Sequence, residues 1–311
     1  MPIDPADTDG FLGPIRELRA SLRIEAGRVD AVGALLVGGE YRSPDELVSA
    51  TGTSRRTVDA LLRAAGPLLE SADGRVRFSL SSAAAAAAEF GGGPGVPAPD
   101  PWEMLATGDP EMVTAAAALV AGAPHPVPEL DHVPATPVTV LKRGHYLRST
   151  FDLRQARVLF VGDHDLTSLG LFLAGGAPGL KASVVDVAEP LLEYIDTEAR
   201  KRGYDIRCHF ADLRLGLPGA LREAADAAFT DPPYTPEGVR LFVTRGLQGM
   251  ANRRTGRVLV AYGYGEQPAL GLAVQEAVSP LHLTYEAVLP GFNRYDGARA
   301  SGSRAALYVL C

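Results

Sequence analysis

Acidic residues follow successive apolar runs in the second half of the chain, at the points where each run ends. They are Asp163 and Asp165, which flank His164 after Gly162, and then Asp186, Asp212 and Asp231. Carboxylates in such a series can accept hydrogen bonds from sugar hydroxyls and amines, and they attract a positive charge. A single acid at the end of a strand more often caps a helix. Several acids in this order favour a nucleoside-binding site.

The turn at Gly162 argues against a common class of nucleotide. It has one glycine where dinucleotide sites have Gly-x-Gly-x-x-Gly, so a pyrophosphate could not approach the backbone closely, and NAD and FAD are disfavoured. Asp186, roughly twenty residues further on, is placed to hold a ribose, and Asp212 is placed beside the adenine. Asp163 and Asp165 then lie near a cationic sulfonium or its amino-acid arm. The cofactor that fits is S-adenosylmethionine or its decarboxylated form.

A second motif, Asp231-Pro232-Pro233-Tyr234, follows the fourth apolar run. The prolines fix φ and remove two backbone donors, so the carbonyl before them stays free to accept. The Asp231 side chain and that carbonyl can therefore hold an N–H or O–H nucleophile, while Tyr234 offers its ring to the substrate. Alone the motif is only a turn, but in this position it is typical of amino-directed transferases. We expect Asp231 and Tyr234 to be catalytic and Pro232 to line the cofactor site.

The elements that must position these residues alternate between strand and helix. Strands are predicted at 158–161, 182–187, 206–210, 227–230 and 258–262, with helical segments near 166–173, 190–202, 237–252 and 267–277. Such alternation implies a parallel sheet with helices on both faces, and ligands bind at the carboxyl ends of its strands. Two final strands, TYEAVLP and AALYVLC, have no helix between them. We predict an α/β fold in which residues 151–311 form a Rossmann-like catalytic domain of the class I S-adenosylmethionine methyltransferase type.

Residues 1–80 predict a small winged-helix-like domain. Ser43 and Pro44 begin a helix, Gly52 forms a turn, and a second helix follows, after which GRVRFSL supplies a wing-like strand. Residues 81–150 are expected to form a linker, because SSAAAAAAEFGGGPGVPAPDP loses the helical periodicity, and then a short helix and an extended segment. The alanine run within it could also extend a helix.

The charge and composition of the chain limit the classes of partner that it can bind. Residues 1–80 contain ten arginines, no lysine and twelve acids, a net charge of −2, and the whole chain carries −7. Nucleic-acid binding depends on basic surfaces, so a structural or dimerising role of the small domain is favoured and a homodimer stays open. Two cysteines and the absence of an apolar leader or an 18-residue apolar run predict a cytoplasmic protein that does not span a membrane. No histidine has the spacing of a metal ligand.

Three stretches carry a resemblance to a known family: FVGDHDLTSLGL, TDPPYTPEGVRLFVTRGL and GFNRYDGARASGSRAALYVL. Together with the N-terminal helices they resemble the branched-chain polyamine synthases, which are bis(aminopropyl)spermidine synthases. The resemblance implies transfer of an aminopropyl arm from decarboxylated S-adenosylmethionine to a polyamine nitrogen. The family's turn reads Gly-Asp-Asp-Asp, whereas this chain has His164 in place of the middle acid, which in the family handles the amine.

His164 is therefore a candidate base. An imidazole with an unperturbed pKa of about 6.5 suits a neutral or weakly basic nucleophile better than a polyamine, although His164 could instead hold the loop through a neighbouring acid. The favoured function is transfer of the 3-amino-3-carboxypropyl group of intact S-adenosylmethionine to an oxygen or nitrogen of a small molecule. Isonocardicin synthase-like enzymes of antibiotic biosynthesis are similar. The alternatives are aminopropyl transfer to a polyamine, amino-directed methylation, and a ligand-sensing regulator.

Overall fold

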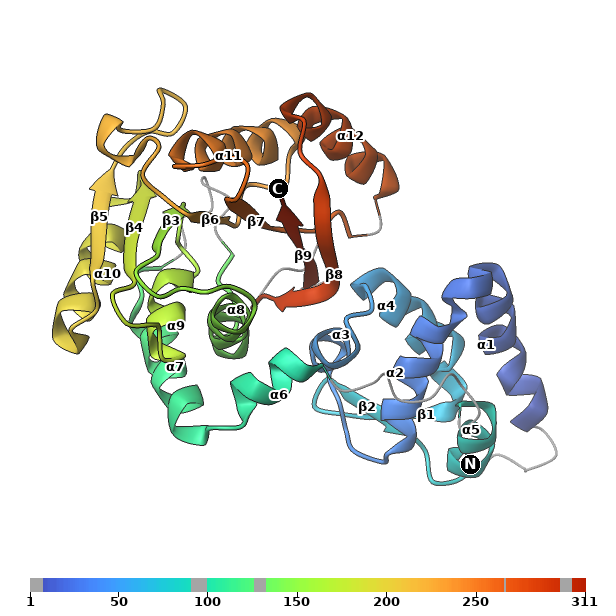
Figure 1. Ribbon diagram of the computed structural model, residues 1–311. Coiled ribbons are helices and arrows are strands. Elements are labelled where there is room, and N and C mark those ends of the chain that lie inside the picture. The colour runs from blue at the N-terminus through green and yellow to red at the C-terminus, as the bar shows by residue number, and fades with distance from the viewer. Residues whose placement is uncertain (1–7, 91–99, 126–132, 266, 297–303) are drawn as a thin grey trace. The chain divides into compact units, whose positions relative to one another are not determined.

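The computed structural model describes residues 8–90, 100–125, 133–265, 267–296 and 304–311 (Figure 1). These residues divide into two compact units, one formed by 8–90 and the other by the remaining ranges. Of the helices that the structure describes, none is both long enough and apolar enough to cross a membrane.

The first unit contains five helices and a hairpin within its described residues. They are α1 (Thr8–Leu22), α2 (Gly27–Val37), α3 (Pro44–Thr51), α4 (Arg55–Ala64), β1 (Leu69–Ala72), β2 (Arg75–Phe78) and α5 (Ala83–Phe90). The side chain of Ser43 accepts from the N–H of Glu46, whose carboxylate accepts from the N–H of Ser43, so α3 begins with a capping box. Gly52 ends α3 with a φ of 64°. The predicted helix–turn–helix and hairpin are present, and assignment as a winged helix stays a prediction.

The segment 81–150 is more helical than the predicted linker, short helix and extended stretch. Its described residues contain α5 in the first unit, and α6 (Pro101–Thr107), α7 (Pro110–Gly122) and α8 (Pro137–Thr150) in the second. Each of the last three helices begins with proline after a residue that caps it, namely Asp100, Asp109 and Thr136. Proline is well tolerated in the first turn of a helix. These prolines therefore mark the starts of helices.

The second unit is built on a seven-stranded mixed sheet. Its strands are β3 (Arg157–Val161), β4 (Lys181–Asp186), β5 (Ile206–Phe210), β6 (Ala227–Thr230), β7 (Arg257–Tyr262), β8 (Tyr285–Arg294) and β9 (Arg304–Leu310). The order is β5-β4-β3-β6-β7-β9-β8, with β3 to β7 parallel and β9 antiparallel to both of its neighbours. This confirms the predicted parallel sheet and its final pair of strands.

Helices cover both faces of this sheet (Figure 1). Those between the strands are α9 (Thr167–Leu173), α10 (Glu189–Arg202), α11 (Pro236–Gly249) and α12 (Pro268–Val278). Val158 and Phe160 of β3 pack with α8, α9 and α10, whereas Leu159 and Val161 pack with α11 and α12. This alternation follows from the two-residue period of a strand. The strand order reverses between β3 and β6, and the carboxyl ends there form the site described next.

Candidate active site

The ends of β3 and β4 bring Gly162 and Asp186 together, as predicted. Gly162 has a φ of 69°, in the left-handed region that glycine adopts without strain. Asp186 is buried; its Oδ2 accepts from the N–H of Asp163 at 3.2 Å, and its Oδ1 accepts from the N–H groups of Val187 and Ala188 at 2.7 and 2.9 Å. These bonds fix the carboxylate beside the turn. A carboxylate has about four lone-pair sites, so Asp186 retains capacity for a hydroxyl of a ligand.

Asp163 is directed toward the start of α9. Both of its oxygens lie 3.2 Å from the N–H of Ser168, and the side chain is fully buried. Burial raises the pKa of Asp163 to about 7, and the charge of Asp186 also raises it, against the hydrogen bonds from Ser168. Asp163 therefore caps a helix. Its place beside a sulfonium stays a prediction that no contact within the protein supports.

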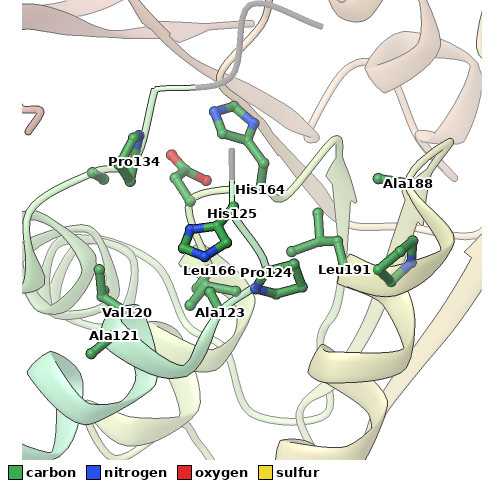
Figure 2. Close-up of a pocket in the computed structure, with 13 residues that line it drawn as sticks. Val120, Ala121, Ala123, Pro124, His125, Pro134, His164, Leu166, Ala188 and Leu191 are labelled. Carbon is green, nitrogen blue, oxygen red and sulfur yellow. The ribbon is translucent and has the colours of Figure 1, made fainter. Parts of the chain in front are cut away.

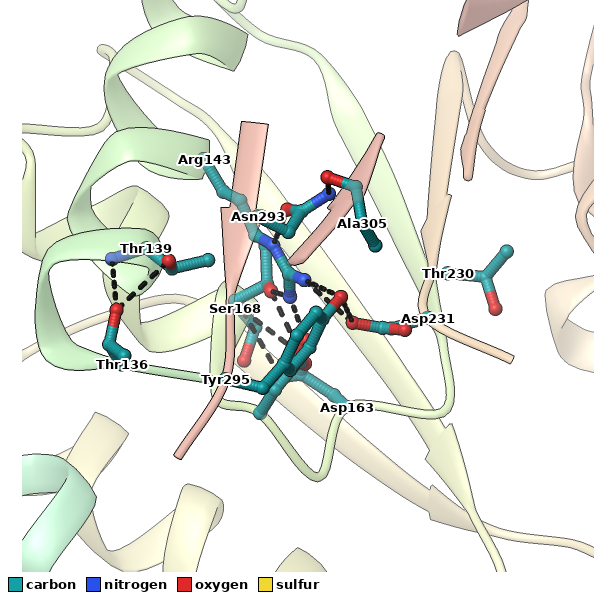
Figure 3. A network of polar contacts seen from close by, with 12 residues as sticks. Thr136, Thr139, Arg143, Asp163, Ser168, Thr230, Asp231, Asn293, Tyr295 and Ala305 are labelled. Carbon is teal, nitrogen blue, oxygen red and sulfur yellow. Dashed lines mark hydrogen bonds and ion pairs between the residues drawn. The ribbon is translucent and has the colours of Figure 1, made fainter. Parts of the chain in front are cut away.

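A buried arginine from α8 joins the ends of two other strands (Figure 3). Arg143 has no exposed surface, and its Nη2 donates to Oδ2 of Asp231, after β6, at 2.6 Å. Its Nη1 forms an ion pair with Asp165, after β3, and donates to Oγ1 of Thr167 at 2.9 Å. Buried charges are costly unless paired, so one guanidinium stabilises two carboxylates that would otherwise repel each other.

The remaining nitrogen of Arg143 is also bonded. Its Nε donates to Oδ1 of Asn293 at 2.8 Å, and Nδ2 of Asn293 donates in turn to the carbonyl of Ala306 at 3.0 Å. Both residues belong to the β8–β9 pair. The network therefore connects α8, β3, β6 and the antiparallel end of the sheet, and it fixes the positions of Asp165 and Asp231.

Tyr234 reaches Asp231 through a second tyrosine. The hydroxyl of Tyr234 donates to that of Tyr295 at 2.9 Å, and Tyr295 donates to Oδ2 of Asp231 at 2.6 Å. Burial raises the pKa of both tyrosines well above the ordinary value, so both stay protonated donors. The ring of Tyr234 also packs edge-on against Tyr262, with centroids 5.5 Å apart. Pro232 is buried within the same loop.

Arg143 and Tyr295 belong to the network although the sequence pattern assigns neither of them a role. Arg143 lies in a segment that the sequence predicts to be extended, where a lysine–arginine pair suggests a solvated run. Val140, Leu141 and Leu147 of α8 pack into three different apolar clusters, so this helix is buried around most of its circumference, and Arg143 lies within the buried stretch. A one-sided helical periodicity is therefore absent here and gives no signal for Arg143.

His164 and Asp165 line a pocket of about 240 Å³ near this network (Figure 2). The other lining residues come from the end of α7 and the residues after it, the segment before α8, the turn before α9 and the start of α10: Val120, Ala121, Ala123, Pro124, His125, Pro134, Ala135, Leu166, Ala188, Pro190 and Leu191. Burial lowers the pKa of His164, although the charges of Asp231 and Asp186 oppose this. The imidazole is therefore neutral at pH 7 and can accept a proton.

Asp212 lies apart from this arrangement. Its carboxylate accepts from the guanidinium of Arg214 at 2.6 Å and from the N–H of Arg214 at 2.9 Å. These hydrogen bonds lower the pKa of Asp212. The residue thus stabilises a turn after β5, and its place beside an adenine stays a prediction. Within the described ranges, no group of three or more histidine, cysteine or acidic side chains could hold a metal ion.

The strand order, which reverses between β3 and β6, is that of a fold of the S-adenosylmethionine-dependent methyltransferase type. A sequence model of the branched-chain polyamine synthase A C-terminal domain matches residues 111–306, more than half of the chain, and the chain belongs to this family. The crystal structure of the branched-chain polyamine synthase from Thermus thermophilus, in complex with N4-aminopropylspermidine and 5'-methylthioadenosine, has the same fold. It matches with a TM-score of 0.61 and 20% identity over 97% of this chain and 92% of that chain.

Two curated relatives match over shorter segments. An uncharacterised protein from Methanocaldococcus jannaschii is 36% identical over 171 residues, which cover 54% of this chain and 42% of that protein. The N(4)-bis(aminopropyl)spermidine synthase of Thermococcus kodakarensis is 37% identical over 125 residues, which cover 40% of this chain and 35% of that enzyme. The chain therefore matches less than half the length of these two relatives.

Proposed function

We propose that this protein is an aminopropyltransferase that uses decarboxylated S-adenosylmethionine and alkylates an amine nitrogen of a small molecule. Membership of the branched-chain polyamine synthase family favours this function over aminocarboxypropyl transfer, which the sequence first suggested. The observation that carries the proposal is Asp231. It lies at the carboxyl end of β6, where Arg143 and Tyr295 hold it. Its negative charge, like that of Asp186, acts on the imidazole of His164 and favours the protonated form.

The donor is proposed to bind at Gly162 and Asp186. A side chain at position 162 would come within 3.0 Å of Phe242 and 3.8 Å of Oδ2 of Asp186, so glycine keeps the approach to this carboxylate open. Asp186 is already oriented by three backbone N–H groups, and it can accept from ribose hydroxyls without rearrangement. The sulfonium of the bound donor supplies a thioether leaving group.

Asp231 is proposed to hold the acceptor nitrogen. Among the described residues, the hydrogen bonds to its carboxylate fall on Oδ2, which leaves Oδ1 to accept an N–H of the acceptor. His164, which burial keeps neutral, can then take the proton that the nitrogen loses. Most of the rate acceleration should come from alignment of the nitrogen with the donor carbon, since the leaving group is already good.

One observation favours a second candidate, the transfer of 3-amino-3-carboxypropyl from intact S-adenosylmethionine. Arg143 offsets part of the negative charge of Asp165 and Asp231, and the turn carries His164 between its acids. The carboxylate of intact S-adenosylmethionine would therefore be repelled less than in a site with unpaired acids.

The two candidates differ in the mass that the acceptor gains. The protein is to be incubated separately with S-adenosylmethionine and with its decarboxylated form, each with a panel of amines and phenols, and the acceptor products weighed. We expect an aminopropyl adduct that forms only with the decarboxylated donor. An adduct that retains the carboxylate and forms only with the intact donor would establish the second candidate instead.

Methylation of a nucleic-acid base is a less favoured alternative. In the first unit, Arg55 pairs with Asp45 and Asp59 at 2.6 and 2.8 Å, and Arg75 pairs with Glu46 at 2.6 Å. These pairs leave less positive charge to attract phosphate. A salt-sensitive shift of DNA or RNA in a gel would revive this alternative.

A further inference from the structure

Residues 133–136 form a short segment beside the site, here called the strap. The N–H of Thr136 donates to the carbonyl of Arg294 at 3.0 Å. The N–H of Asp296 donates to the carbonyl of Pro134, also at 3.0 Å. These two hydrogen bonds pair the strap antiparallel with the residues at the end of β8 and just after it.

The strap supports Asp231 through Tyr295. Ala135 lies opposite Tyr295 in the antiparallel pairing, and both residues are buried in one apolar cluster, against which Val133 packs. The hydroxyl of Tyr295 donates to Oδ2 of Asp231 at 2.6 Å. The strap therefore fixes the backbone that carries this tyrosine, and the tyrosine in turn holds the carboxylate.

The strap also contacts His164. Pro134 and Ala135 line the same pocket as His164 (Figure 2). Burial lowers the pKa of His164, and a hydrogen bond with the backbone of Val133 opposes this shift. A carbonyl can only accept, so the ring nitrogen that faces Val133 carries a proton. In a neutral imidazole the second ring nitrogen then carries the lone pair that can take up a proton.

We propose that the carbonyl of Val133 fixes the tautomer of His164, and that the strap thereby positions this base relative to Asp231. The inference rests on the proposed aminopropyl transfer and adds Val133 to it as a positioning residue. In the reaction, the acceptor nitrogen bonds to the carbon of the propyl arm next to sulfur. The carbon–sulfur bond breaks, its electron pair stays on sulfur, and 5'-methylthioadenosine leaves. The alkylated nitrogen gives one proton to the second ring nitrogen of His164, and the bond to Val133 persists in the imidazolium.

Nitrogen-15 NMR of the imidazole tests the tautomer directly. Protein labelled with nitrogen-15 histidine is measured at about pH 8, where His164 is neutral, and the signals of His164 are assigned by their loss in His164→Gln. We expect one protonated and one unprotonated ring nitrogen, the pattern of a single tautomer. Averaged signals of two exchanging tautomers would overturn the inference and leave aminopropyl transfer standing.

Pro134→Gly tests whether the strap is the cause. The proline restricts Val133, the residue before it, to an extended conformation, so glycine should let the carbonyl of Val133 turn away from His164. We expect signals of a second tautomer and a loss of about tenfold in kcat. A single tautomer together with unchanged kcat in Pro134→Gly would overturn the inference.

Pro178→Gly is the matched control. Pro178 is exposed in the turn before β4, and glycine there loosens the unfolded chain to a similar extent. We expect this control to keep the single tautomer and the kcat of the wild type. If the wild-type protein forms no aminopropyl adduct with any amine, the proposed function is overturned, and with it the role of His164 as the base.

Discussion

The Nη2 atom of Arg143 lies 2.6 Å from Oδ2 of Asp231, which joins the middle of α8 to the loop after β6. The same guanidinium pairs with Asp165 after β3. Helix α8, which precedes the alternating strands and helices, therefore positions the residues after both β3 and β6, where the strand order of the sheet reverses. The site depends on α8 as much as on the strands that carry its acids.

Arg143→Met should destabilise the protein strongly. It leaves Asp165 and Asp231 buried without their cation, and loss of one partner of a buried pair typically costs about 3–5 kcal/mol. Urea denaturation measures the change in the free energy of unfolding. Arg154→Met is the control, because the pair of Arg154 with Asp152 is exposed, and little change is expected there. Equal stability of the two variants would show that the buried network contributes little.

Asp231→Asn should lower kcat far more than it lowers stability. The amide keeps the shape and can still accept from Tyr295, but it loses the charge that assists deprotonation of the acceptor. We expect steady-state kinetics to show a loss of about a hundredfold or more in kcat. Thermal unfolding should show only a small change in the melting temperature. Asp152→Asn, at an exposed position outside the site, should keep normal turnover. Near-normal turnover of Asp231→Asn would remove this residue from the mechanism.

Asp163 should make the protein lose stability as the pH rises. Its pKa is raised by burial to about 7, above that of an unfolded aspartate, so its stabilising contribution is complete below about pH 4 and is lost as the pH passes 7. Asp163→Asn removes this titration and keeps an acceptor for Ser168. The stability of the wild-type protein relative to the variant should therefore fall between pH 4 and pH 8, by at most about 4 kcal/mol. If the free energies of unfolding of the wild type and the variant changed with pH in the same way across this range, the raised pKa of Asp163 would be contradicted.

Asp186→Ala should weaken the binding of 5'-methylthioadenosine. A hydrogen bond to a charged group contributes about 1.5–3 kcal/mol, and calorimetry should register a loss of this size in binding free energy. Asp212→Ala is the comparison, because Asp212 is engaged by Arg214, and we expect a smaller loss there. Unchanged affinity of Asp186→Ala would refute the ribose assignment.

The sheet could be predicted from the sequence because β3, β6 and β7 are largely apolar runs that end at an acid or a glycine. The positions of Asp186 and Asp231 followed from this pattern. Helix α8 could not be predicted in the same way, since it is buried on most sides and its buried residues include Lys142 and Arg143, types that are usually exposed. The inward orientation of Asp163 also depends on the helix start that it caps, which local sequence does not reveal.

Chromatography of the nucleoside by-product, after reaction with either donor in the presence of acceptor, shows directly whether a propyl-type arm leaves a sulfonium donor at this site. We expect 5'-methylthioadenosine to accumulate in step with the alkylated acceptor, and Asp231→Asn to suppress both. Accumulation of S-adenosylhomocysteine instead would mean methyl transfer and would exclude the proposed alkyl transfer.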